Sequence, residues 1–341
     1  MGNFLLSALA VALLAAVGAE REPDLQQLEE RAELGDAWAQ STLGWRYHEG
    51  IGVEKDAAKA VGWYRKAAEQ DYDYAQYMLG TCYYEGEGVE KNLAQAVEWY
   101  RKAAAQDYDY AQYMLGVCYH EGEGVEKNFA QAVEWYRKAA EQENEWAQYM
   151  LGECYSTGEG VDQDWVKSVE WLRRAATQGY APAQSALGYY YYAGQGVEKD
   201  LTKAFEWTKK AAEQGDRMGQ NNLGDCYEKG EGVEQDDVKA VEWYSKAAEQ
   251  GSPLAQTSIG EYHRKGGGGL EKDFAKAVEL FKKAAEQEYD EAQFCLGECY
   301  LKGEGVEKDA EKAVEWFKKA AEQGHEKARD ELKRIQGGAG G

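Results

Sequence analysis

The chain has 341 residues, with 39 Lys plus Arg against 62 Asp plus Glu, which gives a formal net charge of −23. This balance argues against a nucleic-acid-binding protein, because affinity for a phosphate backbone comes mainly from Lys and Arg. Only 3 Pro occur, and 13% of the residues are aromatic. Such a composition excludes a disordered acidic chain and favours helices over a mainly β fold.

Residues 1–19 carry no charge and contain an apolar run from Phe4 to Val17. The run is short for a bilayer span, and the small residues Val17, Gly18 and Ala19 that end it are typical of a signal-peptidase site. We therefore predict a cleaved signal peptide over residues 1–19, although this n-region lacks Lys and Arg. A short membrane anchor or a buried N-terminal helix is the alternative.

A repeat governs the rest of the chain. The tract AQSTLGWRYHEGIGV at Ala39 returns as AQYMLGTCYYEGEGV at Ala75, and the same phase continues to the C-terminus in steps of 36 residues, with one step of 37. Eight units cover residues 37–325. A period in this range predicts a solenoid, in which each unit buries its apolar face only against its neighbours.

Each unit reads as two helices. In the second unit, helical spacing predicts a first helix from about Asp73 to Glu85, and the glycines that follow would end it. Asn92 then occupies the N-cap of the second helix, and every unit has Asp or Asn at this position. The second helix carries Trp99 and Tyr100 on an apolar stripe that we assign to the core.

A glycine follows the core Leu or Ile inside every first helix, as Gly80 does in the second unit. Glycine costs roughly 1 kcal/mol relative to alanine in a helix interior. Its recurrence in all eight units indicates that the two helices approach too closely for a Cβ atom.

The pattern A-x-x-x-L-G-x-x-Y, then G-x-G-V, then D-x-x-K-A-x-x-W-Y-x-K-A-A-x-Q-G resembles the Sel1-like repeats, which are related to tetratricopeptide repeats. The resemblance implies an all-α, right-handed superhelical solenoid of antiparallel helix pairs that acts as an interaction scaffold. Residues 20–36 and 326–336 then resemble an N-terminal and a C-terminal capping helix, and we expect residues 337–341 to be a disordered tail.

No catalytic, cofactor or metal site is apparent in the sequence. The four histidines are scattered over four units, and no H-E-x-x-H, G-x-S-x-G or Walker pattern occurs. The G-x-G pairs follow helices rather than strands, which argues against a dinucleotide site. We therefore expect a protein that is not an enzyme and has no cofactor.

The six cysteines read as small buried apolar residues. One branch of the family links its repeats through C-x7-C disulfides and is associated with β-lactamase-like activity. No two cysteines here stand eight apart, which weakens that association.

By the resemblance, exposed positions of the first helices form the concave wall. These positions are rich in aromatic residues, which we take as candidate partner-binding residues, namely Trp38, Trp45, Tyr74, Tyr77, Tyr84, Tyr110, Tyr113, Trp146, Tyr149, Tyr189 and Tyr192. Tyr77, Tyr113 and Tyr149 share one position in successive units and are predicted to form an exposed ladder. The alternative is that these tyrosines pack one unit against the next.

Two functions fit these features. The leading one is a non-enzymatic scaffold that binds a peptide or partner protein, expected to be basic, on its acidic and aromatic concave face. The alternative is a cell-envelope enzyme or a glycan-binding protein that acts on peptidoglycan-like material. In either case we expect an exported protein (periplasmic, secreted or in the endoplasmic reticulum lumen), without an integral membrane segment after signal removal.

Overall fold

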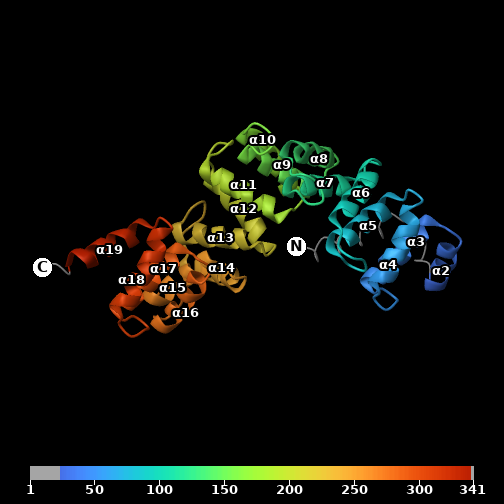
Figure 1. Cartoon of the computed structure of the whole chain (residues 1–341). Helices are drawn as coiled ribbons and strands as arrows, with labels where there is room; N and C mark the ends of the chain where they lie inside the picture. The colour runs from blue at the N-terminus through green and yellow to red at the C-terminus, as the bar shows by residue number, and fades with distance from the viewer. Residues whose placement is uncertain (1–23, 339–341) are drawn as a thin grey trace. The chain divides into compact units, whose positions relative to one another are not determined.

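The computed structural model describes residues 24–338 of the chain (Figure 1). The predicted signal peptide lies outside the described residues, and so do residues 20–23 of the predicted N-terminal cap and residues 339–341 of the predicted tail. Within the described part the structure is all-helical, with eighteen α-helices and a single isolated β-bridge between Gly267 and Leu270. The described residues divide into two compact parts, with the boundary between Ala139 and Ala140. We call them the N-terminal part and the C-terminal part and describe each separately below.

The N-terminal part begins with α2, in the place of the predicted N-terminal cap, and continues with three helix pairs. Consecutive helices pack against one another, as a solenoid requires. Their bounds are α2 Leu25–Glu33, α3 Ala37–Glu49, α4 Ala57–Ala68, α5 Asp73–Glu85, α6 Leu93–Ala104, α7 Asp109–Glu121 and α8 Phe129–Glu141. The boundary between the two compact parts lies inside α8.

The C-terminal part continues the same alternation of helices and ends with a lone helix. That helix, α19, reaches Gly338, two residues beyond the predicted cap, so the predicted tail begins within a helix. The bounds are α9 Glu145–Thr157, α10 Trp165–Thr177, α11 Ala181–Ala193, α12 Leu201–Glu213, α13 Arg217–Lys229, α14 Asp237–Glu249, α15 Pro253–Lys265, α16 Phe274–Ala285, α17 Asp290–Lys302, α18 Ala310–Glu322 and α19 Glu326–Gly338.

The predicted helix boundaries are confirmed by their capping geometry. In α12, the Asp200 side chain accepts a hydrogen bond from the backbone N–H of Lys203 at 3.0 Å, and the other second helices begin in the same way. The first helix α5 ends at Gly86, whose φ of 80° places it in the left-handed region. These local signals explain why each unit breaks into two helices of similar length.

In six of the eight units, the ring that fills the core is the residue after the tryptophan position. Tyr100 is fully buried, whereas Trp99 is only half-buried and lies under the Nζ atom of Lys102, 3.8 Å from the ring centroid. The assignment of the tryptophans to the core is therefore only half right. They cover the edge of the core and contribute a cation–π contact on the surface.

The recurrent glycine of the first helix leaves room for this buried ring. A Cβ atom on Gly80 would lie 2.7 Å from Cδ1 of Tyr100 and 3.3 Å from the backbone oxygen of Ala96. The prediction that the helices approach too closely for a Cβ is confirmed. The atoms that would clash belong mainly to the aromatic ring.

Buried glutamines link the two helices within a unit, a feature that the sequence analysis did not recognise. In seven units, a glutamine near the end of the second helix donates its side-chain amide to a buried glutamine of the first helix of the same unit. Seven such pairs are Gln70 to Gln40, Gln106 to Gln76, Gln178 to Gln148, Gln214 to Gln184, Gln250 to Gln220, Gln287 to Gln256 and Gln323 to Gln293, at 2.7–3.1 Å.

Candidate functional site

The two best-defined candidate residues of the N-terminal part are buried. Tyr74 and Tyr77 are only 6% and 5% exposed. The ring centroid of Tyr77 lies 5.4 Å from that of Tyr108 and 6.1 Å from that of Tyr110, in the next helix pair. The expectation that these two tyrosines face solvent is wrong, because the following unit places aromatic rings directly over them. They pack unit against unit, which was the alternative interpretation.

The other candidates of the N-terminal part are half-buried, namely Trp38, Trp45, Tyr84, Tyr110 and Tyr113. Trp38 lies under the guanidinium of Arg31, 5.0 Å away, and the Tyr84 hydroxyl donates to Glu123. The Tyr113 ring lies 6.0 Å from the buried Tyr136 ring. The predicted ladder of exposed rings therefore does not form over the N-terminal part.

The C-terminal part differs, because its candidates surround open space. Tyr189 and Tyr192 are 53% and 37% exposed, whereas Trp146 and Tyr149 are half-buried. All the lining residues of two adjoining hollows belong to the C-terminal part. The two hollows share Tyr189 and Asn222. The structure thus brings Tyr149, Tyr189 and Tyr192 to one surface.

The larger hollow, which we call the acidic groove, has a volume of about 640 Å³. It lies across the first helices α9, α11 and α13, the wall that the resemblance assigned to binding. Its lining contains two carboxylates and no Lys or Arg, and consists of Tyr149, Glu153, Pro182, Ser185, Ala186, Tyr189, Tyr190, Asp216, Met218 and Asn222.

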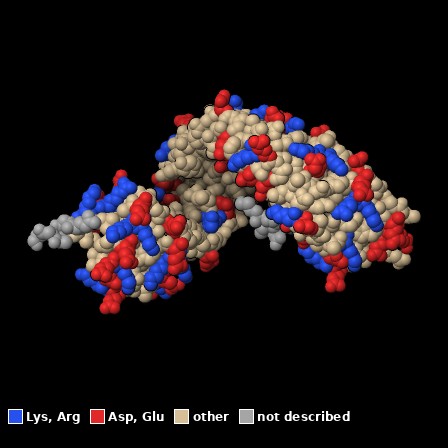
Figure 2. Space-filling view, viewed as in Figure 1, with Lys and Arg blue, Asp and Glu red and all other residues tan. Residues whose placement is uncertain are grey.

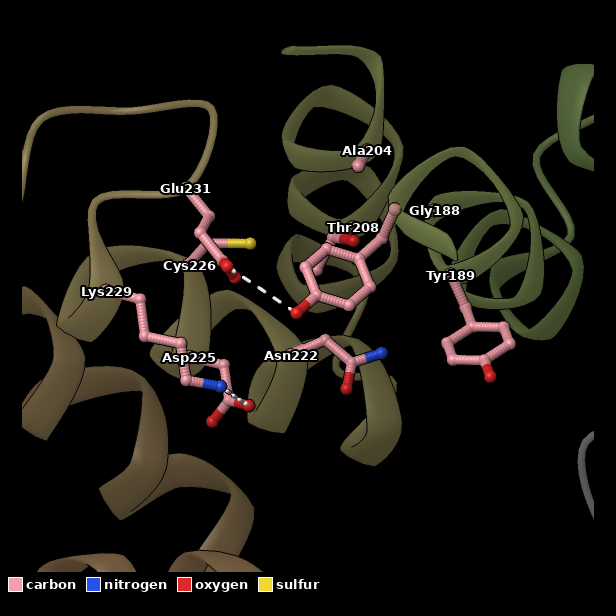
Figure 3. Close-up of a pocket in the computed structure, with 10 residues that line it drawn as sticks. Gly188, Tyr189, Ala204, Thr208, Asn222, Asp225, Cys226, Lys229 and Glu231 are labelled. Carbon is pink, nitrogen blue, oxygen red and sulfur yellow. Dashed lines mark hydrogen bonds and ion pairs between the residues drawn. The ribbon is translucent and has the colours of Figure 1, made fainter. Parts of the chain in front are cut away.

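The smaller hollow, which we call the threonine pocket, has a volume of about 280 Å³ and lies between α11, α12 and α13 (Figure 3). Gly188, Ala204 and Thr208 are among its lining residues, together with polar side chains of α13. Its full lining is Gly188, Tyr189, Tyr192, Ala204, Thr208, Asn222, Asp225, Cys226, Lys229 and Glu231.

The electrostatics of this surface are negative. In the threonine pocket, Lys229 is paired with Asp225 at 3.0 Å, and the Tyr192 hydroxyl donates to Glu231 at 3.5 Å. In the acidic groove, burial raises the pKa of the Glu153 carboxyl and raises the pKa of Tyr149 to about 12. A cationic group that entered the groove would therefore meet a carboxylate that lacks full hydration.

On the face drawn in Figure 2, Lys and Arg are interspersed with Asp and Glu. Across residues 24–338, no group of three or more His, Cys, Asp and Glu side chains could hold a metal ion. None of the helices in that same range has the length and apolar character needed to cross a membrane.

The sequence analysis missed three of the residues that line these hollows. Thr208, Asn222 and Asp216 were not among the candidates, although the repeat contains a signal for Thr208. The position after the tryptophan carries Tyr, Phe or Leu in seven units and threonine only in the fifth. Comparing the units position by position would have identified it.

Two comparisons with known proteins agree with this architecture. A family model for the Sel1 repeat matches eight successive segments, residues 39–72, 73–108, 109–144, 147–180, 181–216, 217–252, 253–289 and 290–325. The crystal structure of a protective antigen present in uropathogenic Escherichia coli strains, displaying an SLR fold, is 43% identical. The match has a TM-score of 0.80 and covers 92% of this chain and 67% of that one.

A Sel1 repeat protein from Oxalobacter formigenes is 34% identical, with a TM-score of 0.65, and the match covers 95% of this chain and 92% of the other. The secretory immunoglobulin A-binding protein EsiB of Escherichia coli O6:H1 (strain CFT073) is 42% identical over 69 residues. That alignment spans 20% of this chain and only 14% of EsiB. The eight matched segments and the two solved structures lead to one conclusion: this chain belongs to the Sel1 repeat family.

Proposed function

We propose that this protein binds a basic segment of a partner protein in the acidic groove on α9, α11 and α13. Sel1 repeat solenoids are typical scaffolds for protein–protein interaction and are generally non-enzymatic. The observation that carries the proposal is the lining of the groove, in which Glu153 and Asp216 are accompanied by tyrosines and by no Lys or Arg.

The physical argument has two parts. Carboxylates in a concave, partly dehydrated surface attract cationic groups, which raises the association rate and selects basic partners. Exposed tyrosines such as Tyr189 supply large contact areas with little conformational entropy to lose. EsiB carries the name of a secretory immunoglobulin A-binding protein, which supports a protein partner in this family, although it does not identify the partner of this chain.

The proposal can be tested with a peptide array of Lys- and Arg-containing segments and, in parallel, a peptidoglycan-fragment array. The double variant Glu153→Gln/Asp216→Asn removes both charges of the groove, and Asn at position 216 still provides the N-cap that Asp216 gives to Gly219. A matched control is Glu206→Gln/Glu249→Gln, which removes two exposed charges from the second helices α12 and α14 of the C-terminal part.

We expect the wild type and the control to bind basic peptides, and the groove variant to bind them several-fold more weakly. Binding should weaken as salt rises, because screening shortens the range of the attraction. If the groove variant binds like the control, or if only the glycan array gives signal, the proposal is wrong.

We also propose that the protein is exported. The support is the uncharged, apolar N-terminal sequence that ends in small residues, as in a signal peptide. Expressing the full chain in an export-competent host and measuring the intact mass of the recovered protein tests this. A mass lower by residues 1–19 is expected, and an unprocessed chain in the cytosolic fraction would contradict it.

A further inference from the structure

The fifth unit has the smallest buried side chain at the position after the tryptophan. The residue after the tryptophan position is a fully buried aromatic in six units and a fully buried leucine in the fourth, Leu172. In the fifth unit it is Thr208, which is 3% exposed. The six aromatic residues are Tyr64, Tyr100, Tyr136, Tyr244, Phe281 and Phe317.

In these six units the ring packs on the core glycine of the first helix of its own unit. Tyr244 lies over Gly224, since a Cβ there would come within 2.6 Å of its Cδ1 atom, and its hydroxyl donates to Glu228 at 3.0 Å. Tyr100 lies over Gly80 in the same way, and its hydroxyl reaches Thr81 at 3.3 Å. A ring at this position thus fills the space between the core glycine and the outer edge of the first helix.

In the fifth unit that space is open. Thr208 still meets the core glycine, because a Cβ on Gly188 would lie 2.5 Å from its hydroxyl oxygen, but its side chain ends there. The threonine pocket of about 280 Å³ lies at this place, with Thr208 and Gly188 among its lining residues (Figure 3). For scale, an apolar cavity of roughly 150 Å³ is large enough to hold benzene.

The surroundings of the pocket indicate what would enter it. Tyr189, which stands next to Gly188, is more than half exposed, and Tyr192 one turn later is also exposed. The pocket adjoins the acidic groove through Tyr189 and Asn222, so a chain that lies in the groove can place one side chain in the pocket. Its volume is just below the range of about 300–1,000 Å³ typical of small-molecule sites, which favours a single side chain over a whole ligand.

We propose that the threonine pocket receives a tyrosine or phenylalanine side chain of the partner, in the place that the repeat's own ring fills in six other units. The inference rests on the proposed function, because the basic segment in the acidic groove carries the ring. The ring would stack with Tyr189 and Tyr192, and Lys or Arg residues beside it would face Glu153 and Asp216.

The test uses the whole chain and the peptide acetyl-Gly-Lys-Tyr-Lys-Gly-amide, with a second peptide in which Ala replaces Tyr and with p-cresol as the isolated ring. Thr208→Tyr introduces the residue that four of the eight units carry and should close the pocket without lowering the melting temperature. Thr208→Leu, which copies the fourth unit, is a second closing variant. Thr202→Tyr places the same ring at an exposed site of the same helix and is the matched control.

Affinity is measured by calorimetry, and entry into the pocket by the NMR signal of the ¹³C-labelled threonine methyl that disappears in Thr208→Leu. We expect the tyrosine peptide to shift this methyl signal in the wild type and to bind the Thr202→Tyr control equally well. Both closing variants should bind it about tenfold or more weakly, and the alanine peptide should bind the wild type with a similar loss.

The inference is overturned if the closing variants bind the tyrosine peptide as the wild type does, or if the tyrosine and alanine peptides bind alike. It is also overturned if p-cresol binds as tightly as the peptide, because the pocket would then take a free aromatic molecule. If only the Glu153→Gln/Asp216→Asn variant weakens the peptide, the pocket is wrong and the groove stands. If neither the pocket nor the groove variants change binding, both proposals fail.

Discussion

Gln106 donates its side-chain amide to the side-chain oxygen of Gln76 at 2.9 Å, and Gln76 in turn donates to the backbone oxygen of Ala68 at 3.2 Å. Gln76 is completely buried. The two hydrogen bonds join the end of one second helix, α6, to the end of the preceding one, α4, through the first helix α5. A buried amide satisfied on both sides fixes the spacing of successive units as well as stabilising them.

The first prediction is that Gln76→Leu destabilises the protein. Leucine has a similar size, but it leaves the carbonyl of Ala68 and the amide of Gln106 without this partner, at a cost of about 1–3 kcal/mol. Gln95→Leu, an exposed position on α6, is the control and should have little effect. Urea unfolding followed by circular dichroism measures the shift, and equal midpoints for the two variants would show that the glutamine contact is energetically unimportant.

A second prediction compares two glycines that lie inside helices. Gly80→Ala gains up to about 1 kcal/mol of helix propensity, but the new methyl group would lie 2.7 Å from the buried Tyr100 ring, and overpacking typically costs about 1–3 kcal/mol. Gly62→Ala has nothing within 4 Å of the new Cβ. We therefore expect Gly80→Ala to lower the melting temperature and Gly62→Ala to raise it. A rise in both would mean that the ring moves aside freely.

A third prediction concerns acid. Six second helices begin at an aspartate whose pKa is lowered, chiefly by the hydrogen bond that its carboxylate accepts from a backbone N–H, namely Asp56, Asp164, Asp200, Asp236, Asp273 and Asp309. In the unfolded chain the aspartate pKa is about 3.9. These groups therefore stabilise the fold above that pH, and the contribution is lost as pH falls through the lowered folded values.

Replacing all six aspartates with asparagine should leave the protein folded at pH 7, because Asn92 and Asn128 already cap two helices. The melting temperature of this variant should fall less than that of the wild type between pH 5 and pH 2.5. The control replaces six exposed carboxylates outside the caps with glutamine: Glu54, Glu90, Glu126, Glu198, Glu234 and Glu307. If both sets of substitutions flatten the pH dependence equally, net charge and not capping is responsible.

A fourth prediction concerns the thiols. All six cysteines are free and buried, and burial raises the pKa of Cys82, Cys118 and Cys154 to about 12 and that of Cys226 to about 11. Because the thiolate is the reactive form, the folded protein should react very slowly with a thiol reagent at pH 8. Denaturation without a reductant should release six reactive thiols. A count of four or fewer would reveal disulfide formation, because each disulfide removes two thiols.

Most of the fold follows from the sequence because its signals are local. Asn92 marks the start of a helix, Gly86 marks the end of another, and Gly80 indicates a close approach, whatever the rest of the chain does. The first two signals act through a hydrogen bond or a φ angle within a few residues, and Gly80 acts by leaving room for the Tyr100 ring of the same repeat. Their repetition in every unit then determines the solenoid, because a helix pair can bury its apolar face only against another pair.

The exposed face was decided by packing between units. Tyr77 occupies a position that the resemblance assigned to the concave surface, yet it is buried, because Tyr108 and Tyr110 of the following pair cover it. Tyr189 remains exposed on α11, and Met218 of the following first helix is itself 59% exposed. The repeat determines where a side chain is placed, but its burial depends on the atoms that the neighbouring unit places opposite it.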